Sequence, residues 1–436
     1  MHEEASTRVL AGLLVLAALA AGFSGCVSRW VMPETEPRAA SFFDQTELAR
    51  GGQLAAAGNC FSCHTVDGGK PYAGGRPLRT PFGVIYGTNI TPDPDTGIGR
   101  WSLAAFARAM REGLDREGRH LYPAFPYDHF TLLTDEDIGA LYAFFMTREP
   151  VRAESPASRV SVPRFLVAAW NAMFLEKRSF RPDPAQSTQW NRGAYLVEAV
   201  AHCGACHTPR NLLGAEKKNQ PFAGGESEDW HAPALNASSP SPVPWTAEAL
   251  YTYLGTGMAD LHGMSAGPMT EVVHNLAQVS EEDLRAIATY VAALDTRSGP
   301  ERERTRDSAL ARARRQMPVI PGDERNAGAI ERGGAIYAGA CADCHDRGRA
   351  VEGGALRLPL GTALTLPTPR NLIHIIRDGI VPDHADRGPW MPDYAGALTE
   401  QQLTDLVIYL RALTDKPAWT DVPGDVRRIL DVSSER

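Results

Sequence analysis

Apolar side chains recur at helical spacing in three stretches of the chain, and each stretch opens with the same polar signal. A hydroxyl residue stands three positions before an acidic or amide residue, as in a capping box at a helix start. The three signals are Thr134-Asp-Glu-Asp137, Ser280-Glu-Glu-Asp283 and Thr399-Glu-Gln-Gln402. The apolar face is clearest at Leu284, Ile287, Ala288 and Val291, and at Leu403, Leu406, Val407 and Leu410. The pattern predicts three amphipathic helices that close three repeated segments.

Two other features repeat upstream of these closing helices. An Arg-Gly pair beside an apolar stretch predicts an opening helix in each segment. The pairs are Arg50-Gly51, Arg192-Gly193 and Arg332-Gly333. Between the opening and closing helices, another helical stretch ends at a glycine, which favours a left-handed cap. Each glycine has an apolar residue seven positions earlier: Phe106 before Gly113, Leu250 before Gly257 and Leu372 before Gly379.

Each segment also contains one C-x-x-C-H motif, the attachment sequence of c-type haem. Cysteines three apart share a face of a helical turn, so both can form thioethers to one porphyrin edge, and the adjoining histidine reaches the iron as proximal ligand. Zinc sites would bring two cysteine pairs within about 20 residues of each other, whereas the motif histidines lie 143 and 138 residues apart. We therefore predict three haem c groups with their iron, attached at Cys60 and Cys63, Cys203 and Cys206, and Cys341 and Cys344, with proximal ligands His64, His207 and His345.

Two methionines are candidates for the distal ligands. Met269 and Met391 stand twelve residues after Gly257 and Gly379. A thioether suits haem iron and raises its reduction potential. A lone methionine is more often core filler, but two in the same place of a repeat favour ligation.

The first segment departs from this pattern, because Phe125 stands in that place and cannot bind iron. His129 and Met110 are the main candidates for the sixth ligand, and the residue types alone leave both open. His120 and Met146 are further candidates, although Met146 falls in a closing helix. Bis-histidine ligation would give this haem the lowest potential of the three.

Charge and length limit the function classes. The 436 residues carry a formal charge of −8, and no dense basic face is present for nucleic acid. Val9 to Phe23 form an uncharged apolar run, followed by Ser24-Gly25-Cys26. This predicts an export signal with either a lipid anchor at Cys26 or a retained helix that reaches Ser28. Both would attach the protein to a bacterial cell membrane on its periplasmic face.

The connections between segments differ in composition. Residues 165–175 form an apolar, helix-length patch, for which core packing is the default and membrane or partner contact the alternatives. Residues 298–315 alternate acidic and basic side chains and predict a solvated connector. Five remaining histidines show no metal-ligand spacing and are interpreted as surface or core residues: His231, His262, His274, His374 and His384.

Several segments closely resemble the triheme cytochrome c subunits of bacterial membrane-bound dehydrogenases. They are Thr80 to Tyr86, Thr88 to Asp93, Gly97 to Gly99, His120 to Tyr127 and His202 to Asn211. The resemblance implies an all-α fold of three tandem class I cytochrome c domains with long loops. The domain boundaries are an export signal or anchor at 1–40, domains at 41–152, 187–297 and 326–416, an apolar linker at 153–186, a charged linker at 298–325 and a tail at 417–436.

The resemblance also implies a task, namely to accept electrons from a periplasmic dehydrogenase subunit and pass them to membrane quinone or a terminal oxidase. Relatives that serve quinoprotein alcohol dehydrogenases or flavin gluconate and sorbitol dehydrogenases usually have methionine in place of Phe125. Phe125 with Asp128-His129-Phe130 looks more like the branch that accompanies molybdenum hydroxylases. In that branch a molybdopterin subunit and a small iron-sulfur subunit oxidise aldehydes or N-heteroaromatics.

Two other functions fit parts of the sequence. An open first haem would make the chain a peroxidase-like multihaem enzyme, which Phe125 permits. Passive haem storage would predict no reduction by any dehydrogenase. Electron transfer itself needs no nucleophile or general base, so we expect no catalytic residues in this chain.

Overall fold

Hydroxyl caps start the three closing helices in the computed structural model, which describes residues 31–36, 40–315, 326–346, 357–380 and 391–434. Thr134 Oγ1 accepts from the Asp137 N–H at 3.1 Å, and Ser280 Oγ accepts from the Asp283 N–H at 3.2 Å. Thr399 and Gln402 form a complete capping box. About half of the chain is helical and little is strand, so the helical class is confirmed.

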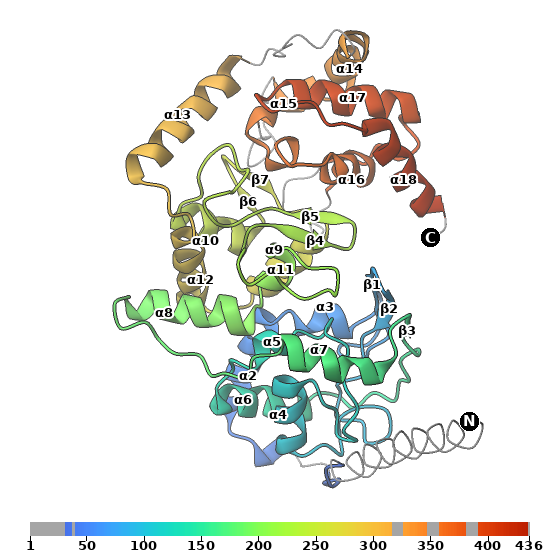
Figure 1. Ribbon diagram of the computed structural model, residues 1–436, viewed down its shortest axis with the longest axis vertical. Helices are drawn as coiled ribbons and strands as arrows, with labels where there is room; N and C mark the ends of the chain where they lie inside the picture. The colour runs from blue at the N-terminus through green and yellow to red at the C-terminus, as the bar shows by residue number, and fades with distance from the viewer. Residues whose placement is uncertain (1–30, 37–39, 316–325, 347–356, 381–390, 435–436) are drawn as a thin grey trace, which may run out of the picture. The chain divides into compact units, whose positions relative to one another are not determined.

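The chain divides into two compact units, Met1–Leu54 with Cys63–Phe180, and Ala55–Ser62 with Arg181–Arg436. The helices α2 (Gln45–Ala57) and α3 (Cys60–His64) contain residues of both units. The rest of the first unit consists of η1 (Ala40–Phe42), β1 (Pro77–Thr80), β2 (Gly83–Tyr86), α4 (Leu103–Glu112), α5 (Tyr127–Phe130), α6 (Asp135–Met146), β3 (Arg159–Val160), η2 (Arg164–Leu166) and α7 (Val167–Phe174). Its strands form one antiparallel sheet in the order β1-β2-β3 (Figure 1).

The second unit contains both the second and the third C-x-x-C-H motif. Its first half consists of α8 (Thr188–Tyr195), the π-helical turn η3 (Leu196–Val200), α9 (Gly204–His207), β4 (Gly225–Ser227), β5 (Trp230–Ala232), α10 (Ala247–Thr256), β6 (Met258–Ala259), β7 (Gly263–Met264), α11 (Pro268–Leu276) and α12 (Glu281–Ala293). Its second half consists of α13 (Gly299–Arg315), α14 (Ala327–Ala340), α15 (Ala342–His345), η4 (Leu358–Leu360), η5 (Thr362–Leu364), α16 (Arg370–Asp378), α17 (Glu400–Ala412) and α18 (Val422–Ser434). β4 pairs with β5 and β6 with β7 as short antiparallel ribbons.

One helix crossing occurs three times, and a glycine makes each crossing possible. A Cβ atom on Gly51, Gly193 or Gly333 would lie only 2.0 to 2.2 Å from a backbone oxygen of the closing helix α6, α12 or α17. The oxygens belong to Ala140, Ala286 and Asp405, each six residues after its cap residue. The aromatic residue ten positions after each cap packs on the same glycine: Phe144, Tyr290 and Tyr409. Opening and closing helices therefore meet in the same register in all three segments.

The arginine before each glycine pairs with a carboxylate of the closing helix. Arg50 bonds Asp137 at 2.6 Å and Arg192 bonds Asp283 at 2.7 Å. Both partners stand three residues after the cap. In the third segment that position is an amide, and Arg332 instead pairs at 2.7 Å with Asp405, one helical turn further on.

The three middle helices end at the predicted glycines. Gly113 and Gly257 adopt the left-handed conformation, with φ of 62° and 78°. Gly379 has a positive φ of 69° but an extended ψ of −168°, so it ends α16 differently from the left-handed cap that we predict. Phe106, Leu250 and Leu372 are buried, as their spacing predicts.

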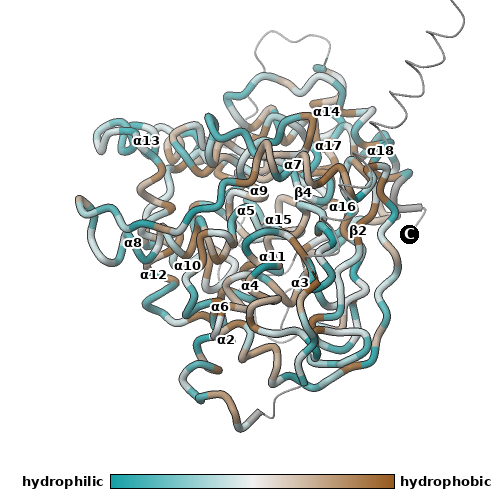
Figure 2. The backbone as a smooth tube through the Cα atoms, turned by 60° about the horizontal axis from the view of Figure 1, so that its bottom comes forward, coloured by the Kyte–Doolittle hydropathy of each residue, from teal (hydrophilic) through white to brown (hydrophobic). Residues whose placement is uncertain are grey.

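Two segments beyond the repeats pack more closely than their composition predicts. Residues 299–315 form helix α13, which is largely hydrophilic (Figure 2) but buries Ala309 and Ala313 against Val243 and Leu360. The tail forms α18, whose Val422, Val426 and Ile429 join the core around α16 and α17. Small side chains at helical spacing suffice for such contacts.

The predicted apolar patch forms η2 and α7 in the first unit. Trp170 is buried, whereas Phe165 and Met173 are exposed. Within the described parts of the chain, no helix has both the length and the apolar character needed to cross a membrane. The predicted amino-terminal anchor, including Cys26, lies outside the described residues.

Candidate functional site

The three C-x-x-C-H motifs form short helices directly after the opening helices. Cys60 and Cys63 lie on α3, while Cys203 and Cys341 stand at the starts of α9 and α15. All six motif cysteines are half-buried thiols. The helical turn puts both sulfur atoms of a motif on one face, as covalent attachment to a single porphyrin requires.

The motif histidines of the first two segments are oriented by backbone carbonyls. The Nδ1 atom of His64 lies 2.6 Å from the Thr88 oxygen, and that of His207 lies 2.7 Å from the Pro233 oxygen. Since a carbonyl only accepts, Nδ1 carries the proton. Burial lowers the pKa of both histidines, outweighing the carbonyl bond that raises it. Each ring is therefore neutral and has a lone pair on Nε2, the form that binds a metal.

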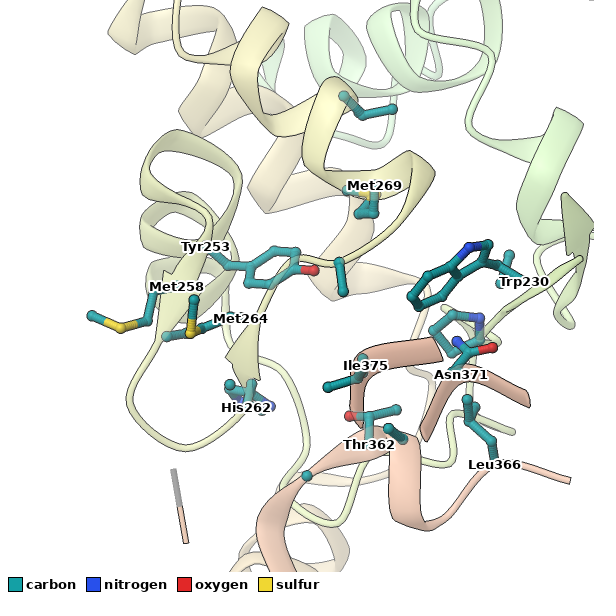
Figure 3. A pocket seen from close by; sticks show the side chains of 18 of the residues that line it. Trp230, Tyr253, Met258, His262, Met264, Met269, Thr362, Leu366, Asn371 and Ile375 are labelled. Atoms are coloured by element: carbon teal, nitrogen blue, oxygen red, sulfur yellow. The ribbon is translucent and has the colours of Figure 1, made fainter. Parts of the chain in front are cut away.

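A cavity of about 550 Å³ lies within the second unit, and residues of both of its motifs line it. Figure 3 shows part of the cavity wall. Cys203, Cys206 and His207 line it together with Cys341, Cys344 and His345. The remaining lining is mostly apolar, for example Leu254, Val272 and Leu364. Paired thiols, a neutral imidazole and an apolar wall are the donor set and surroundings that fit haem c.

The two methionines predicted as distal ligands line this same cavity. Met269 comes from the first turn of α11, and Met391 comes from the strand-like bridge that pairs it with Ile380. Met258 and Met264, on β6 and β7, line the cavity as well (Figure 3). The spacing rule misses these two, since they lie one and seven residues after Gly257. Ligation by Met269 and Met391 stays a prediction.

In the first unit, aromatic rings occupy the place of the missing methionine. Phe125 packs on Phe130, with ring centroids 5.4 Å apart, and on Tyr127 at 6.4 Å. Tyr127 is buried and donates to Asn171 Oδ1 at 2.7 Å. Phe125 is thus part of an aromatic cluster.

The candidates for the first sixth ligand lie in different places. Met110 is buried on α4, three residues before Gly113. The equivalent residue of the second segment, three before Gly257, is Leu254, which lines the cavity. His129 lies on α5, sixteen residues after Gly113, and the equivalent Val273 is not among the described cavity-lining residues.

The two remaining candidates have other surroundings. His120 Nδ1 lies 3.4 Å from Asn171 Nδ2, and burial and the Arg164 guanidinium lower its pKa. Met146 is buried in α6. His120 stands seven residues after Gly113, as the cavity-lining Met264 does after Gly257. Met146 stands twelve residues after its cap, as the cavity-lining Ala292 does in the second segment.

Two histidines without metal-ligand spacing make ring stacks instead. His262 stacks on Trp245 with centroids 3.6 Å apart, and burial lowers its pKa to about 4. His374 stacks on Trp230 at 4.9 Å. The interpretation as core residues holds for both, while His384 lies outside the described residues. The sequence carries no local signal for these pairings.

Two family models match parts of the chain. The model for cytochrome c matches residues 48–149, and the model for cytochrome c oxidase, cbb3-type, subunit III matches residues 328–410. The first match covers the first C-x-x-C-H motif and the second covers the third. Cytochrome c domains and their haem are therefore shown for these parts.

Characterised proteins match over most of the chain. A nicotinate dehydrogenase subunit of Pseudomonas putida is 45% identical over 92% of this chain, which spans only about a third (33%) of that relative's length. The gluconate 2-dehydrogenase cytochrome c subunit of Pantoea cypripedii is 36% identical over 84% of this chain and 85% of its own. The alcohol dehydrogenase (quinone) cytochrome c subunit of Komagataeibacter europaeus is 34% identical over 90% of this chain and 86% of its own. The chain belongs to the family of cytochrome c subunits of dehydrogenases.

Proposed function

We propose that this chain carries three covalent haem c groups and transfers electrons from a periplasmic dehydrogenase subunit to membrane quinone or a terminal oxidase. Three C-x-x-C-H motifs, each after the same glycine helix crossing, support three tandem class I cytochrome c domains. The bound haems supply the redox chemistry. The chain's residues attach them, supply axial ligands and exclude water from the apolar cavity.

For the axial ligands, we assign His64, His207 and His345 to the proximal sides and Met269 and Met391 to two distal sides. The cavity lining supports both methionines. For the first haem, the equivalence of Met110 with the cavity-lining Leu254 favours Met110 over His129. A Met/His pair would remove the reason to rank this haem lowest in potential.

The partner that we favour is a molybdenum hydroxylase-type dehydrogenase, with a molybdopterin subunit and a small iron-sulfur subunit. One observation carries this proposal: identity is 45% with the nicotinate dehydrogenase subunit but 33 to 36% with the subunits for gluconate, fructose and alcohol. Phe125 in place of a methionine points the same way. The substrate would then be an aldehyde or an N-heteroaromatic.

The second candidate is service to a quinoprotein alcohol dehydrogenase or a flavin gluconate or sorbitol dehydrogenase. It is favoured by the relatives that match this chain over most of both lengths. Those relatives support the cytochrome architecture of this chain. The cofactor of the dehydrogenase partner is a separate property, which a shared cytochrome architecture does not determine.

We also propose that the chain works on the periplasmic face of the cell membrane, held there by its amino terminus. The apolar run from Val9 and the Gly25-Cys26 pair support this location. If Cys26 carries the lipid, Cys26→Ala releases the haem protein from the membrane fraction. If the apolar run is a retained helix, the same variant stays bound.

The test of the partner is reduction of this cytochrome in membranes that contain its complex. Nicotinate or an aldehyde should reduce the haems, and growth on tungstate in place of molybdate should abolish that reduction. Gluconate and ethanol serve as the matched substrates for the second candidate. Reduction by gluconate or ethanol that is insensitive to tungstate would refute the molybdenum proposal.

A further inference from the structure

The β4–β5 hairpin and helix α16 make a tight contact inside the second unit. The ring of Trp230 on β5 stacks on that of His374, with an interplanar angle of 21°. Asn371 Oδ1 accepts from the His231 N–H at 2.8 Å, and Asn371 Nδ2 donates to the His231 oxygen at 2.9 Å. We call Trp230, His231, Asn371 and His374 the clasp. It joins the segment of the second motif to that of the third.

Ion pairs fix the turn of the same hairpin. Asp229 pairs with Arg370 at 3.3 Å, with His374 at 3.3 Å and with Arg428 at 2.9 Å. Asp229 has a positive φ of 67°, a conformation that residues other than glycine rarely adopt. All three partners belong to α16 or α18, so the third segment holds the turn in place.

The other side of the hairpin touches both faces of the second haem site. Trp230 packs so closely on Gly267 that a Cβ atom there would lie 2.3 Å from the indole. Gly267 precedes α11 and lies two residues before Met269. Pro233 follows β5 directly, and its carbonyl orients His207. One short strand thus connects the distal and proximal sides.

Resting on the proposed function, we propose that α16 of the third segment positions both axial ligands of the second haem through the clasp. Trp230 supports the loop before Met269, and the bonds of Asn371 to His231 fix the strand that leads to Pro233. The potential of the second haem then depends on packing by the third segment. Figure 3 shows Trp230 and Asn371 near each other at the cavity.

His374 is the residue to change, because it supports Trp230 but is not among the described residues that line the cavity. His374→Ala removes the ring behind Trp230 and should loosen the hairpin. His374→Phe keeps a ring for the stack, and Asn371→Asp keeps the acceptor but loses the donor to His231. Val426→Ala is the control, because Val426 is buried in the core that α18 forms with α16 and α17 and is not part of the clasp.

Two measurements on the full haem-loaded chain report on the second haem. A redox titration measures the midpoint potentials of the haems. The potential that shifts in the variant Met269→His is assigned to the second haem. Proton NMR of the reduced protein resolves the Met269 methyl group, which the haem ring current shifts upfield. His374→Ala should lower that potential and broaden or remove that methyl signal, since water entry and weaker thioether ligation both favour ferric iron. His374→Phe should restore both, and Asn371→Asp should lower the potential.

The outcomes separate the two proposals. Unchanged potential and methyl signal in both His374→Ala and Asn371→Asp, with full haem content, would overturn the role of the clasp. An equal shift in Val426→Ala would overturn it too, because general loosening would then explain the effect. Fewer than three haems in the unaltered chain would overturn the proposed function itself, and this inference with it.

Discussion

Phe125 stands where the other segments have Met269 and Met391, and we propose Met110 as the sixth ligand of the first haem. Met110→Leu should convert the first haem from low-spin to high-spin, because leucine fills the space but has no donor atom. Electron paramagnetic resonance of the oxidised protein measures the change. The matched control is Met146→Leu, since Met146 is equally buried in α6.

His129→Ala completes the comparison at this haem and should keep all three haems low-spin. A high-spin signal in His129→Ala with none in Met110→Leu would reverse the assignment. A high-spin signal in the unaltered protein would revive the peroxidase-like alternative, in which the first haem has an open site.

Some residues of the candidate site can be predicted from the sequence, and others cannot. The places of Met269 and Met391 on the cavity wall follow from spacing, because equivalent residues of a repeat keep their distance from a cap glycine. Met258 and Met264 reach the cavity through a two-residue ribbon that has no sequence signature. The stack of His374 on Trp230 joins residues that are 144 positions apart in different segments, so spacing within one segment cannot reveal it. His262 and Trp245 are 17 residues apart in one segment, but no sequence motif marks their stack.

At the scale of elements, the glycine crossings make a sharp prediction about stability. Gly51→Ala should destabilise the first unit by about 1–3 kcal/mol or more, because its Cβ would overlap the Ala140 oxygen. Gly139→Ala, on the partner helix, has its nearest neighbour at 3.5 Å and should stabilise it by up to about 1 kcal/mol. Guanidinium unfolding followed by circular dichroism measures both. Equal effects would contradict the crossing.

The hairpin turn predicts a pH dependence for the second unit. Burial raises the pKa of Asp229, but Arg428 and His374 together lower it by more than burial raises it, so the pKa in the folded protein lies below the ordinary 3.8. The ionised Asp229 therefore stabilises the fold fully above pH 3.8, and this contribution is lost as the pH falls through the folded pKa. Because the carboxylate is partly exposed, the loss is on the order of 1 kcal/mol. Unfolding titrations at a series of pH values should show that the free energy of unfolding falls less steeply at acid pH in Asp229→Asn than in the unaltered protein. An unchanged acid dependence in this variant would exclude Asp229 as its cause.

Local signals predict which helices form but not how far the packing extends. The caps, the crossing glycines and the apolar faces of α12 and α17 all follow from short-range patterns. The burial of α13 and α18 does not follow from such patterns. Alanine and a few branched residues on a polar helix are buried only where another part of the chain provides a surface to pack against. The charge pattern of residues 298–315 predicts no more than a solvated connector, and the tail at 417–436 carries no prediction of packing.

At the scale of the whole molecule, haem content is the decisive count. The double variant Cys203→Ser with Cys206→Ser should contain two haems per chain instead of three, because it lacks both thioether positions of the second motif. The same replacement of Cys60 and Cys63 should have the same effect. A pyridine haemochrome assay with protein quantification measures this. Two equivalents in the unaltered chain, or zinc in a metal analysis, would contradict three attachment sites.

The π-helical turn at Leu196–Val200 explains how the second segment tolerates a longer approach to its haem. Its arginine stands 11 residues before the first cysteine, compared with 10 and 9 in the other segments. A π-turn absorbs an extra residue without shifting the helix on either side. An insertion can thus persist through evolution while the crossing at Gly193 and the attachment at Cys203 both keep their places. Deleting one residue from this turn should therefore give a regular helix and an intact cytochrome.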